Sequence, residues 1–130
     1  MVISSQNNSW DNVMYQYKCV VIRWLDGDTC NLDVDLGFDI HLKQRVRVFG
    51  INAPEIHTKN KAEKKRGLDA LAFAESLCPV NSTIEVKSHK SNDEEKFGRW
   101  LADIKLQNGS DFASAMIEGG HATAYFGGKR

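Results

Sequence analysis

The chain has 130 residues, of which 42% are hydrophobic and 26% are charged. These proportions are typical of one compact soluble domain that buries roughly two-thirds of its unfolded surface. The 17 basic and 17 acidic residues give a formal net charge of zero. This balance excludes a strongly basic coat that binds nucleic acid nonspecifically, but it leaves a local basic cleft open.

Sequence signals for membrane insertion, secretion or disulfide cross-linking are missing. No apolar run approaches the ~20 residues of a membrane span, and the polar N-terminus lacks an apolar signal core. We therefore expect a cytoplasmic protein, secreted only if a signal has already been removed, with no membrane partner and a monomeric state. The scattered Cys19, Cys30 and Cys78 form no Cys-x-x-Cys spacing, which favours free buried thiols.

The first part of the chain divides into a leader and an antiparallel meander. Residues 1–14 lack hydrophobic periodicity and are expected to form a flexible leader before a single domain over residues 15–130. Period-two alternation predicts three strands, joined by a tight turn at Asp26-Gly27 and a second turn at Gly37. The predicted strands span residues 15–25, 30–36 and 40–51.

A helix, two strands and a second helix are predicted after the meander. The polar, basic segment 56–67 is interpreted as an exposed loop or a frayed helix start. Apolar stripes predict a helix that ends at Cys78-Pro79 and a second helix capped by Ser110 or Asp111. The stripes are Ala70, Phe73, Ala74 and Leu77 in the first helix and Phe112, Ala115, Met116 and Gly119 in the second, and the strands span residues 83–87 and 99–106.

This order of elements, β-β-β-α-β-β-α with an irregular tail over residues 121–130, predicts an α+β fold that is mainly β. Five short strands with a helix between the third and the fourth are the layout of a five-stranded OB-fold barrel, here with two or three helices. Barrels of this type often bind nucleic acid, but the fold alone does not establish a function.

Four short stretches carry residues suited to chemistry on phosphate. They are Asp26-Gly27-Asp28-Thr29, Arg47, Asn52-Ala53-Pro54-Glu55 and Phe97-Gly98-Arg99. In this combination, and with Phe73 and Ala124-Tyr125, the chain resembles the staphylococcal nuclease family over about residues 17–126. The resemblance implies the OB-fold barrel of that family and a metal-dependent nuclease activity.

Hydrolysis of a phosphodiester needs an activated water and groups that stabilise the extra negative charge around phosphorus. Glu55 is the candidate general base, or the residue that orients the attacking water. Arg47 and Arg99 are candidates for a phosphate clamp, because a guanidinium donates two parallel hydrogen bonds to phosphate oxygens and stays charged. Taken singly, Glu55 could be an ordinary loop carboxylate and either arginine a surface ion-pair partner.

Asp28 lies just beyond the first hairpin turn and is a candidate metal ligand, whereas Asp26 is interpreted as the turn residue itself. The resemblance implies that Asp28, Asn52 and the backbone carbonyl of Ala53 hold Ca²⁺. The family usually has Asp where this chain has Asn52, and an amide oxygen brings no charge to a cation. We therefore expect weaker metal binding, or a changed preference between Ca²⁺ and another divalent ion such as Mg²⁺.

Further residues are expected to contact the substrate. The basic segment 59–66, which includes Lys61, matches a basic loop beside the family's cleft and could follow a phosphate backbone. The resemblance also implies contacts from Lys96 and Tyr125. Phe97 stands where the family has a Tyr, so stacking on a base is kept and a hydroxyl contact is lost.

Together these residues predict a Ca²⁺-dependent endonuclease with DNA and RNA as substrates. We expect hydrolysis of single-stranded or frayed chains with little sequence preference, and the resemblance implies expulsion of the 5′ oxygen and a 3′-phosphate product. Asn52 keeps a second hypothesis open, a catalytically weakened or inactive OB-fold module that only binds nucleic acid. A third hypothesis, a purely structural or protein-interaction barrel, would leave Arg47, Glu55 and Arg99 together by chance.

Overall fold

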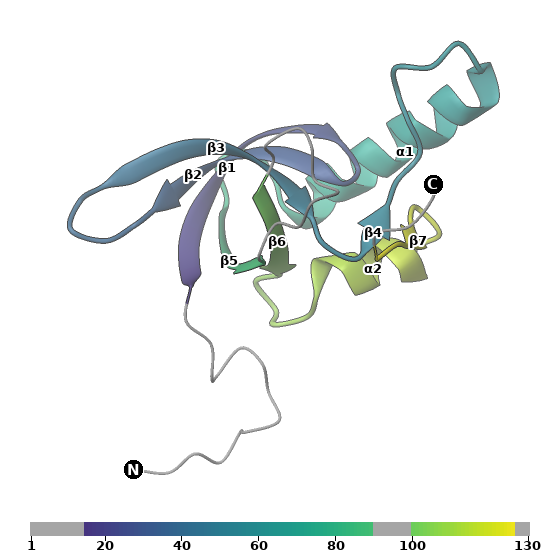
Figure 1. Ribbon diagram of the computed structural model, residues 1–130. Coiled ribbons are helices and arrows are strands. Elements are labelled where there is room, and N and C mark those ends of the chain that lie inside the picture. Colours follow the sequence, from purple (N-terminus) through teal and green to yellow (C-terminus); the bar gives the residue numbers. More distant parts are fainter. Residues whose placement is uncertain (1–14, 90–99, 127–130) are drawn as a thin grey trace.

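The computed structural model of the chain describes residues 15–89 and 100–126 (Figure 1). The predicted leader, residues 1–14, lies outside the described residues. In chain order the elements are β1 (Gln16–Asp26), β2 (Thr29–Asp35), β3 (His41–Val48), β4 (Ile51–Asn52), α1 (Lys61–Leu77), β5 (Thr83–His89), β6 (Trp100–Lys105), α2 (Phe112–Glu118) and β7 (Thr123–Ala124).

Five strands form a closed barrel in the order β1-β2-β3-β6-β5. Neighbours are antiparallel except β3 and β6, which run parallel from the pair Val46–Trp100 to the pair Val48–Ala102. The 11 residues of β1 pair with β5 along their first part and with β2 along their second part, which closes the barrel. The sequence prediction of a mainly β, five-stranded OB-fold barrel is therefore confirmed.

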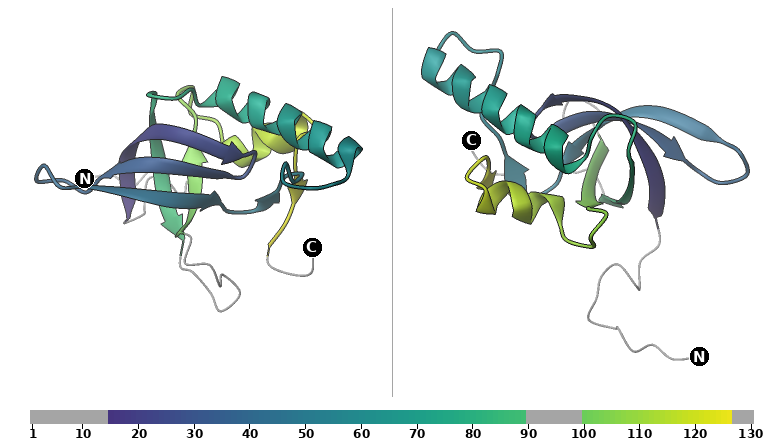
Figure 2. Two further views of the ribbon diagram at one scale, coloured as in Figure 1. Left: turned by 90° about the horizontal axis from the view of Figure 1, so that it is seen from above. Right: turned by 180° about the vertical axis from the view of Figure 1, so that it is seen from behind.

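The barrel interior is filled by alternate strand residues, as the period of two in a β-strand requires. Both helices pack beside one another against the barrel (Figure 2), and neither of these two described helices is long and apolar enough to cross a membrane. Trp24 of β1 stacks on Phe112 of α2 at 4.9 Å between ring centroids and donates its indole N–H to the Cys78 carbonyl at 2.9 Å. One indole thus joins the barrel to both helices.

The predicted third strand, residues 40–51, is two strands in the structure. β3 ends at Val48 and pairs inside the barrel, whereas β4 leaves it as a separate two-residue strand. Gly50 lies between them with φ +91°, a backbone conformation that side chains with a Cβ rarely adopt. The resulting bend carries Asn52 and the residues after it away from the barrel wall.

The tail predicted to be irregular contains a strand. β7 pairs antiparallel with β4, so that Ile51 lies opposite Ala124 and Asn52 lies opposite Thr123. The Tyr125 amide then donates to the Gly50 carbonyl at 2.9 Å. This small sheet brings the C-terminal part of the described chain beside the β3–β4 bend.

The first helix, α1, begins at Lys61, inside the segment 56–67 that was interpreted as an exposed loop or a frayed helix start. Asn60 is its N-cap, and the Asn60 side chain accepts a hydrogen bond from the Glu63 amide at 3.0 Å. This contact satisfies one of the free amides that every helix start leaves. The frayed-start alternative was therefore nearer the structure, and the basic residues from Lys61 onward are helical.

All three cysteines are free and buried, as predicted. Burial raises the pKa of Cys19 and of Cys78 to about 12, and it raises that of Cys30 as well. The reactive thiolate form is therefore scarce at neutral pH, and these thiols act as small apolar side chains.

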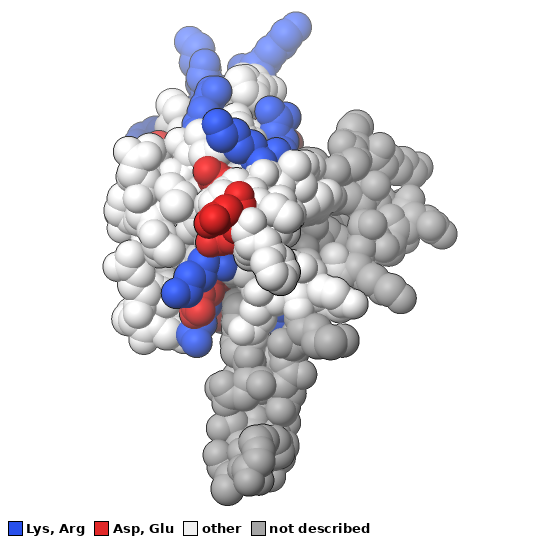
Figure 3. Space-filling view, turned by 90° about the vertical axis from the view of Figure 1, so that its left-hand side faces the viewer, with Lys and Arg blue, Asp and Glu red and all other residues white. Residues whose placement is uncertain are grey.

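Charged side chains are mixed on the face that carries the tip of the β2–β3 hairpin. Figure 3 shows several Lys and Arg side chains projecting at the top of this face, above a group of Asp and Glu side chains with further basic groups below. No continuous basic surface covers this view, in keeping with the zero net charge.

Candidate active site

The turn between β1 and β2 is packed tightly against three other parts of the structure. A Cβ atom at Gly27 would lie 2.9 Å from the Ala53 Cβ, 3.0 Å from the Ala70 Cβ of α1 and 3.1 Å from the Met116 Cε of α2. Because real Cβ atoms do not approach this closely, only glycine fits. Gly27 thereby lets the turn that carries Asp28 sit against the segment after β4.

The Asp28 carboxylate is buried, with 5% of the residue exposed, and both of its oxygens accept hydrogen bonds. The Thr29 hydroxyl donates to Oδ1 at 2.9 Å, and the Ala53 amide donates to Oδ2 at 2.9 Å. The Asp28 carbonyl accepts from the Val48 amide at 2.8 Å. Asp28 therefore joins the first turn to β3 and to the segment after β4, and its orientation is fixed.

Arg47 reaches the same place from β3, where it lies opposite Thr29 in the β2–β3 register. Only 3% of Arg47 is exposed. Its Nη2 lies 3.6 Å from the Asp28 Oδ2 and 3.5 Å from the Asn52 Oδ1, and its Nη1 donates to the Val48 carbonyl at 3.3 Å. A buried guanidinium is thus held between a carboxylate and an amide oxygen.

Tyr125 covers the guanidinium from the C-terminal side. The Arg47 Cζ lies 5.5 Å from the centroid of the Tyr125 ring, within the range of a cation–π contact. The β4–β7 pairing places Tyr125 there, so the residue predicted to contact a nucleotide does lie beside the predicted phosphate clamp. A two-residue strand was too short to be found from sequence pattern.

Asp26 and Asp28 form a pair of neighbouring carboxyl groups with opposite pKa shifts. The pKa of Asp26 is raised from 3.8 to about 7, first by burial and then by the Asp28 carboxylate, and the charge of Glu55 adds to the shift. Burial opposes charge on Asp28 too, but hydrogen bonds from Asp26 and the Ala53 amide, with the Arg47 guanidinium, lower its pKa. The Asp26 carboxylate accepts from the Asp28 amide at 3.0 Å, as expected of a turn residue, and it also lies against the Asp28 carboxyl group.

Glu55 is exposed and follows β4 after Pro54. Its backbone is held by α1: the Glu55 amide donates to the Glu63 Oε2 at 3.4 Å, and a Cβ at Gly67 would lie 2.6 Å from the Glu55 carbonyl oxygen. The helix therefore fixes the segment that presents Glu55, while the carboxylate stays open to solvent.

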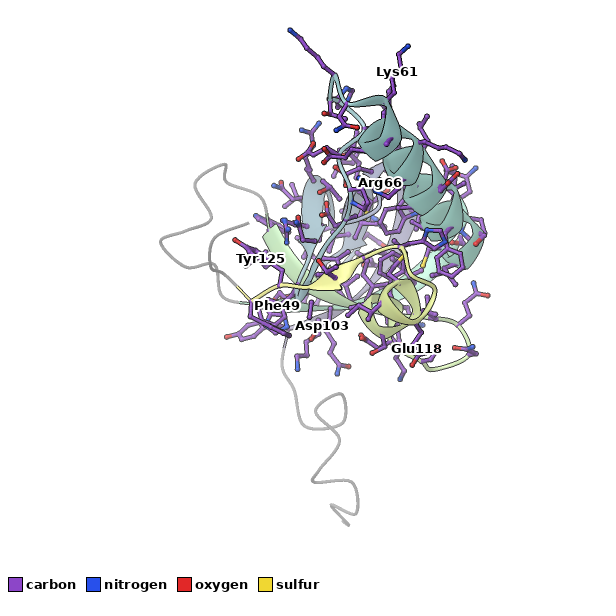
Figure 4. All side chains as sticks on the ribbon, turned by 90° about the vertical axis from the view of Figure 1, so that its right-hand side faces the viewer. Phe49, Lys61, Arg66, Asp103, Glu118 and Tyr125 are labelled. Atoms are coloured by element: carbon purple, nitrogen blue, oxygen red, sulfur yellow. The ribbon has the colours of Figure 1, made fainter. Side chains whose placement is uncertain are left out.

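A polar cleft of about 520 Å³ adjoins Glu55, and we call it the Arg66 cleft. Its lining was not predicted as a set: Arg66 lay inside a basic segment, and His121 showed no ligand spacing. The lining residues are Asn52, Ala53, Pro54, Glu55, Glu63, Arg66, Gly120, His121, Ala122 and Thr123. Lys61 does not line it; Figure 4 shows Lys61 at the outer end of α1 and Arg66 nearer the barrel.

Three of the predicted site residues, Lys96, Phe97 and Arg99, lie outside the described residues. Three other predicted site residues are in direct contact: Arg47 pairs with Asp28 and donates to the Asn52 side chain. Glu55 follows within the same short segment.

The oxygen atoms around Asp28 are of the kinds that a hard divalent cation accepts. Among residues 15–89 and 100–126, no group of three or more His, Cys, Asp or Glu residues is arranged to hold a metal. The carboxyl groups of Asp26 and Asp28 lie side by side, and burial, together with the neighbouring Asp28 carboxylate, raises the pKa of Asp26 to about 7. The Asn52 amide oxygen and a backbone carbonyl are the oxygen donors that such an ion accepts beside carboxylates.

The fold and the site define the chain as an OB-fold barrel protein with a buried arginine–aspartate pair beside a polar cleft. The profile of the family described as "Staphylococcal nuclease homologue" matches residues 45–130, and the chain belongs to this family. The match begins in β3, so it includes Arg47, Asn52 and Glu55.

Two relatives share extended sequence similarity with the chain. An uncharacterized protein of Methanocaldococcus jannaschii is 27% identical over 142 residues, which cover 93% of this chain and 66% of that protein. Endonuclease YhcR of Bacillus subtilis is 29% identical over 122 residues, which cover 85% of this chain and 9% of the endonuclease. The chain thus spans just under two-thirds of the first relative and a small part of the second.

Proposed function

We propose that the protein is a divalent-metal-dependent phosphodiesterase that cleaves single-stranded or frayed DNA and RNA with little sequence preference. The observation that carries this proposal is the buried Asp28–Arg47 pair, joined through Asn52 to the short segment that presents the exposed Glu55. Membership of the staphylococcal nuclease family and the printed name of the Bacillus relative, an endonuclease, support it. Following the family, the products would be 3′-phosphates.

Arg47 would bind the phosphoryl oxygens. Its contacts to Asp28 and Asn52, at 3.6 and 3.5 Å, are long for charge-assisted hydrogen bonds, which are typically about 2.7–2.9 Å. The guanidinium can exchange them for shorter bonds to phosphate, while its 3.3 Å bond to the Val48 carbonyl keeps the group in place. Such a preorganised donor typically contributes about 3 kcal/mol to stabilising a transition state.

Glu55 would take a proton from the attacking water or orient that water. Its carboxylate is exposed, and its backbone is anchored to α1 through Glu63 and Gly67, so the group is reachable by water but fixed in position. Arg99, predicted as the second arm of the phosphate clamp, completes the proposed catalytic set from outside the described residues.

Asp28, Asn52 and the Ala53 carbonyl would hold Ca²⁺ or Mg²⁺, and Asp26 joins them on the basis of its position beside Asp28. When bound, such a cation neutralises negative charge on the phosphoryl oxygens. A proton now shared by the two carboxyl groups would leave as the ion binds, because metal ligands must be deprotonated.

The residues proposed to bind substrate lie around this centre. Tyr125, over the Arg47 guanidinium, would stack on or pack against a nucleotide. Lys61, at the start of α1, would attract the phosphate backbone from a distance, and Lys96 and Phe97 keep the roles that the family resemblance implies. DNA and RNA share the phosphodiester that these groups recognise.

One observation favours a second candidate function. Asn52 accepts from Arg47 but supplies no charge, so the cation site has one carboxylate fewer than the family pattern. A protein with that deficit would be a catalytically weakened or inactive OB-fold module that binds nucleic acid without cutting it.

The test is to incubate purified protein with heat-denatured DNA, or RNA, and Ca²⁺, Mg²⁺ or Mn²⁺, with and without chelator. The nuclease proposal expects cleavage that the chelator abolishes. Glu55→Ala separates the two candidates: it should abolish cleavage and leave binding of a chelator-treated sample to DNA unchanged. Binding without cleavage in the unmodified protein, with every ion, would establish the second candidate instead.

A further inference from the structure

The Arg66 cleft adjoins the proposed reaction centre, yet the chemistry assigned above uses only Glu55 and the Asn52–Ala53 segment from its lining. One wall consists of this segment and α1, and the other wall is the Gly120–Thr123 segment. The β4–β7 pairing of Asn52 with Thr123 holds the two walls together. The cleft is therefore a fixed part of the fold.

Arg66 supplies the cation on the first wall. Its side chain is exposed, and within residues 15–89 and 100–126 no hydrogen bond or ion pair engages the guanidinium. The acidic residue one turn earlier, Glu63, accepts from the Glu55 amide at 3.4 Å, and the neighbouring Lys65 pairs with Asp69 at 3.4 Å. The Arg66 guanidinium is thus available to an anionic ligand in the cleft.

His121 supplies a second donor on the opposite wall. Its ring lies on Phe73 of α1 with centroids 4.6 Å apart, and its amide donates to the Met116 carbonyl at 2.9 Å. In the described part of the chain, neither ring nitrogen of His121 has a hydrogen-bond partner. A half-buried imidazole is therefore held in place with its polar atoms uncommitted.

We propose that the Arg66 cleft binds the nucleotide adjoining the scissile phosphodiester, with Arg66 on that nucleotide's phosphate and His121 as a second hydrogen-bond donor. This inference rests on the proposed function, because Glu55 places the cleft next to the reaction centre. The carboxylates of Glu55 and Glu63 line the same wall as Arg66 and repel a phosphate from their part of it, so we expect the phosphate between Arg66 and His121 of the opposite wall. The preferred substrate class is then an oligonucleotide that extends into the cleft.

The experiment compares Arg66→Ala with Lys43→Ala, which removes an exposed cation of β3 outside the cleft. Binding of a fluorescent thymidine oligonucleotide of about twelve residues, within the site sizes of OB folds, is measured by anisotropy with chelator present. Hydrolysis of the same oligonucleotide and of the minimal diester thymidine 5′-(4-nitrophenyl phosphate) is measured with metal. The minimal diester carries no second nucleotide to occupy the cleft.

Arg66→Ala is expected to raise the dissociation constant and the KM for the oligonucleotide about tenfold, as for the loss of one charged contact. The kcat for the oligonucleotide and the kcat/KM for the minimal diester should stay within about twofold of the unmodified protein. Lys43→Ala should change every one of these constants by less than about twofold. His121→Ala, from the opposite wall, should move them in the same direction as Arg66→Ala.

The inference is overturned if Arg66→Ala and His121→Ala both match Lys43→Ala in oligonucleotide binding and KM. It is also overturned if Arg66→Ala lowers hydrolysis of the minimal diester as much as that of the oligonucleotide, since that would place Arg66 at the reaction centre. If no variant hydrolyses either compound, the proposed function fails. In that case the anisotropy measurement, which needs no hydrolysis, still tests whether the cleft binds the oligonucleotide.

Discussion

The carboxylate of Asp28 and the guanidinium of Arg47 form a buried ion pair, with 3.6 Å between Oδ2 and Nη2 and less than a tenth of either side chain exposed. The two residues come from different elements, the β1–β2 turn and β3. Arg47 also contacts Asn52 of β4, and Asp28 accepts from the amide of Ala53, the next residue. The pair therefore serves stability and the proposed phosphate site together.

Arg47→Ala tests both roles. Removing one partner leaves the Asp28 carboxylate buried without its cation, so the free energy of unfolding should fall by about 3 kcal/mol. Nuclease activity should fall roughly 100- to 1,000-fold through the lost phosphate contact. Urea unfolding and cleavage of denatured DNA measure the two effects.

The matched control is Arg45→Ala, which removes an exposed arginine two residues earlier on β3. Within residues 15–89 and 100–126, the Arg45 side chain makes one hydrogen bond, from Nε to the Asn31 Oδ1 at 3.5 Å. Its removal should change the free energy of unfolding by less than about 0.5 kcal/mol. Equal effects of the two substitutions would contradict the special position of Arg47.

Asp26 gives the protein a pH dependence in the absence of metal. Between its ordinary pKa of 3.8 and its raised pKa of about 7, the folded protein keeps a proton that the unfolded chain has released. The contribution of Asp26 to the free energy of unfolding therefore decreases as pH rises through this window. Asp28 acts in the opposite direction at lower pH, because its pKa is lowered and its contribution is lost on acidification.

Asp26→Asn should flatten the decrease in stability between about pH 5 and pH 7, measured by urea unfolding in chelator-treated buffer. Asp69→Asn, which changes an exposed carboxylate of α1, should keep the slope of the unmodified protein. In the unmodified protein, Ca²⁺ affinity should rise with pH toward 7, because the ion competes with the Asp26 proton. An unaltered slope in Asp26→Asn would show that its carboxyl is not the group responsible.

Asn52→Asp should restore charge to the proposed cation site. A carboxylate in place of the amide should raise Ca²⁺ affinity about tenfold or more, since affinity follows the number of charged ligands. Isothermal titration calorimetry measures the affinity directly. Asn108→Asp, in an exposed turn, adds the same charge elsewhere and should leave the affinity unchanged. Equal affinities in both variants would remove Asn52 from the site.

Gly67→Ala should displace Glu55 although alanine favours helices. The added Cβ would lie 2.6 Å from the Glu55 carbonyl oxygen, so α1 and the Glu55 segment must move apart. We expect lower kcat with little change in KM, and a loss of stability despite the ~1 kcal/mol that alanine gains over glycine in a helix. A variant as active as and more stable than the unmodified protein would show that the contact does not position Glu55.

Much of the barrel could be predicted because its strands alternate clearly and its turns carry glycine. The split of the third strand at Gly50 required the three-dimensional course of the chain, since Ile51 continues the apolar pattern. β7 consists of two exposed residues that pair only with distant β4, so no local pattern marks it. The early start of α1 had a readable signal, an Asn60-x-x-Glu63 cap, within a run whose charge suggested a loop.

The structure brings together Asp28, Arg47 and Asn52, which carry a family pattern in the sequence, whereas the surroundings of other residues depend on burial. Asp26 is locally a turn residue, and its burial beside Asp28, which raises its pKa, could not be read from the sequence. Arg66 and His121 lie far apart in sequence, and the cleft between them depends on the packing of α1 against the tail. No sequence motif contains both residues, so the sequence could not indicate that they line one cleft.

The most direct test of the central claim is a divalent-ion titration of the cleavage of heat-denatured DNA by the unmodified protein, Glu55→Gln and Glu75→Gln. We predict saturable activation by Ca²⁺ or Mg²⁺, complete loss with chelator, and a decrease of at least about 100-fold in Glu55→Gln. Glu75, exposed on α1, should be replaceable without loss. Cleavage by Glu55→Gln at the rate of the unmodified protein, or no cleavage with any divalent ion, would contradict the assignment of a nuclease site to Asp28, Arg47 and Glu55.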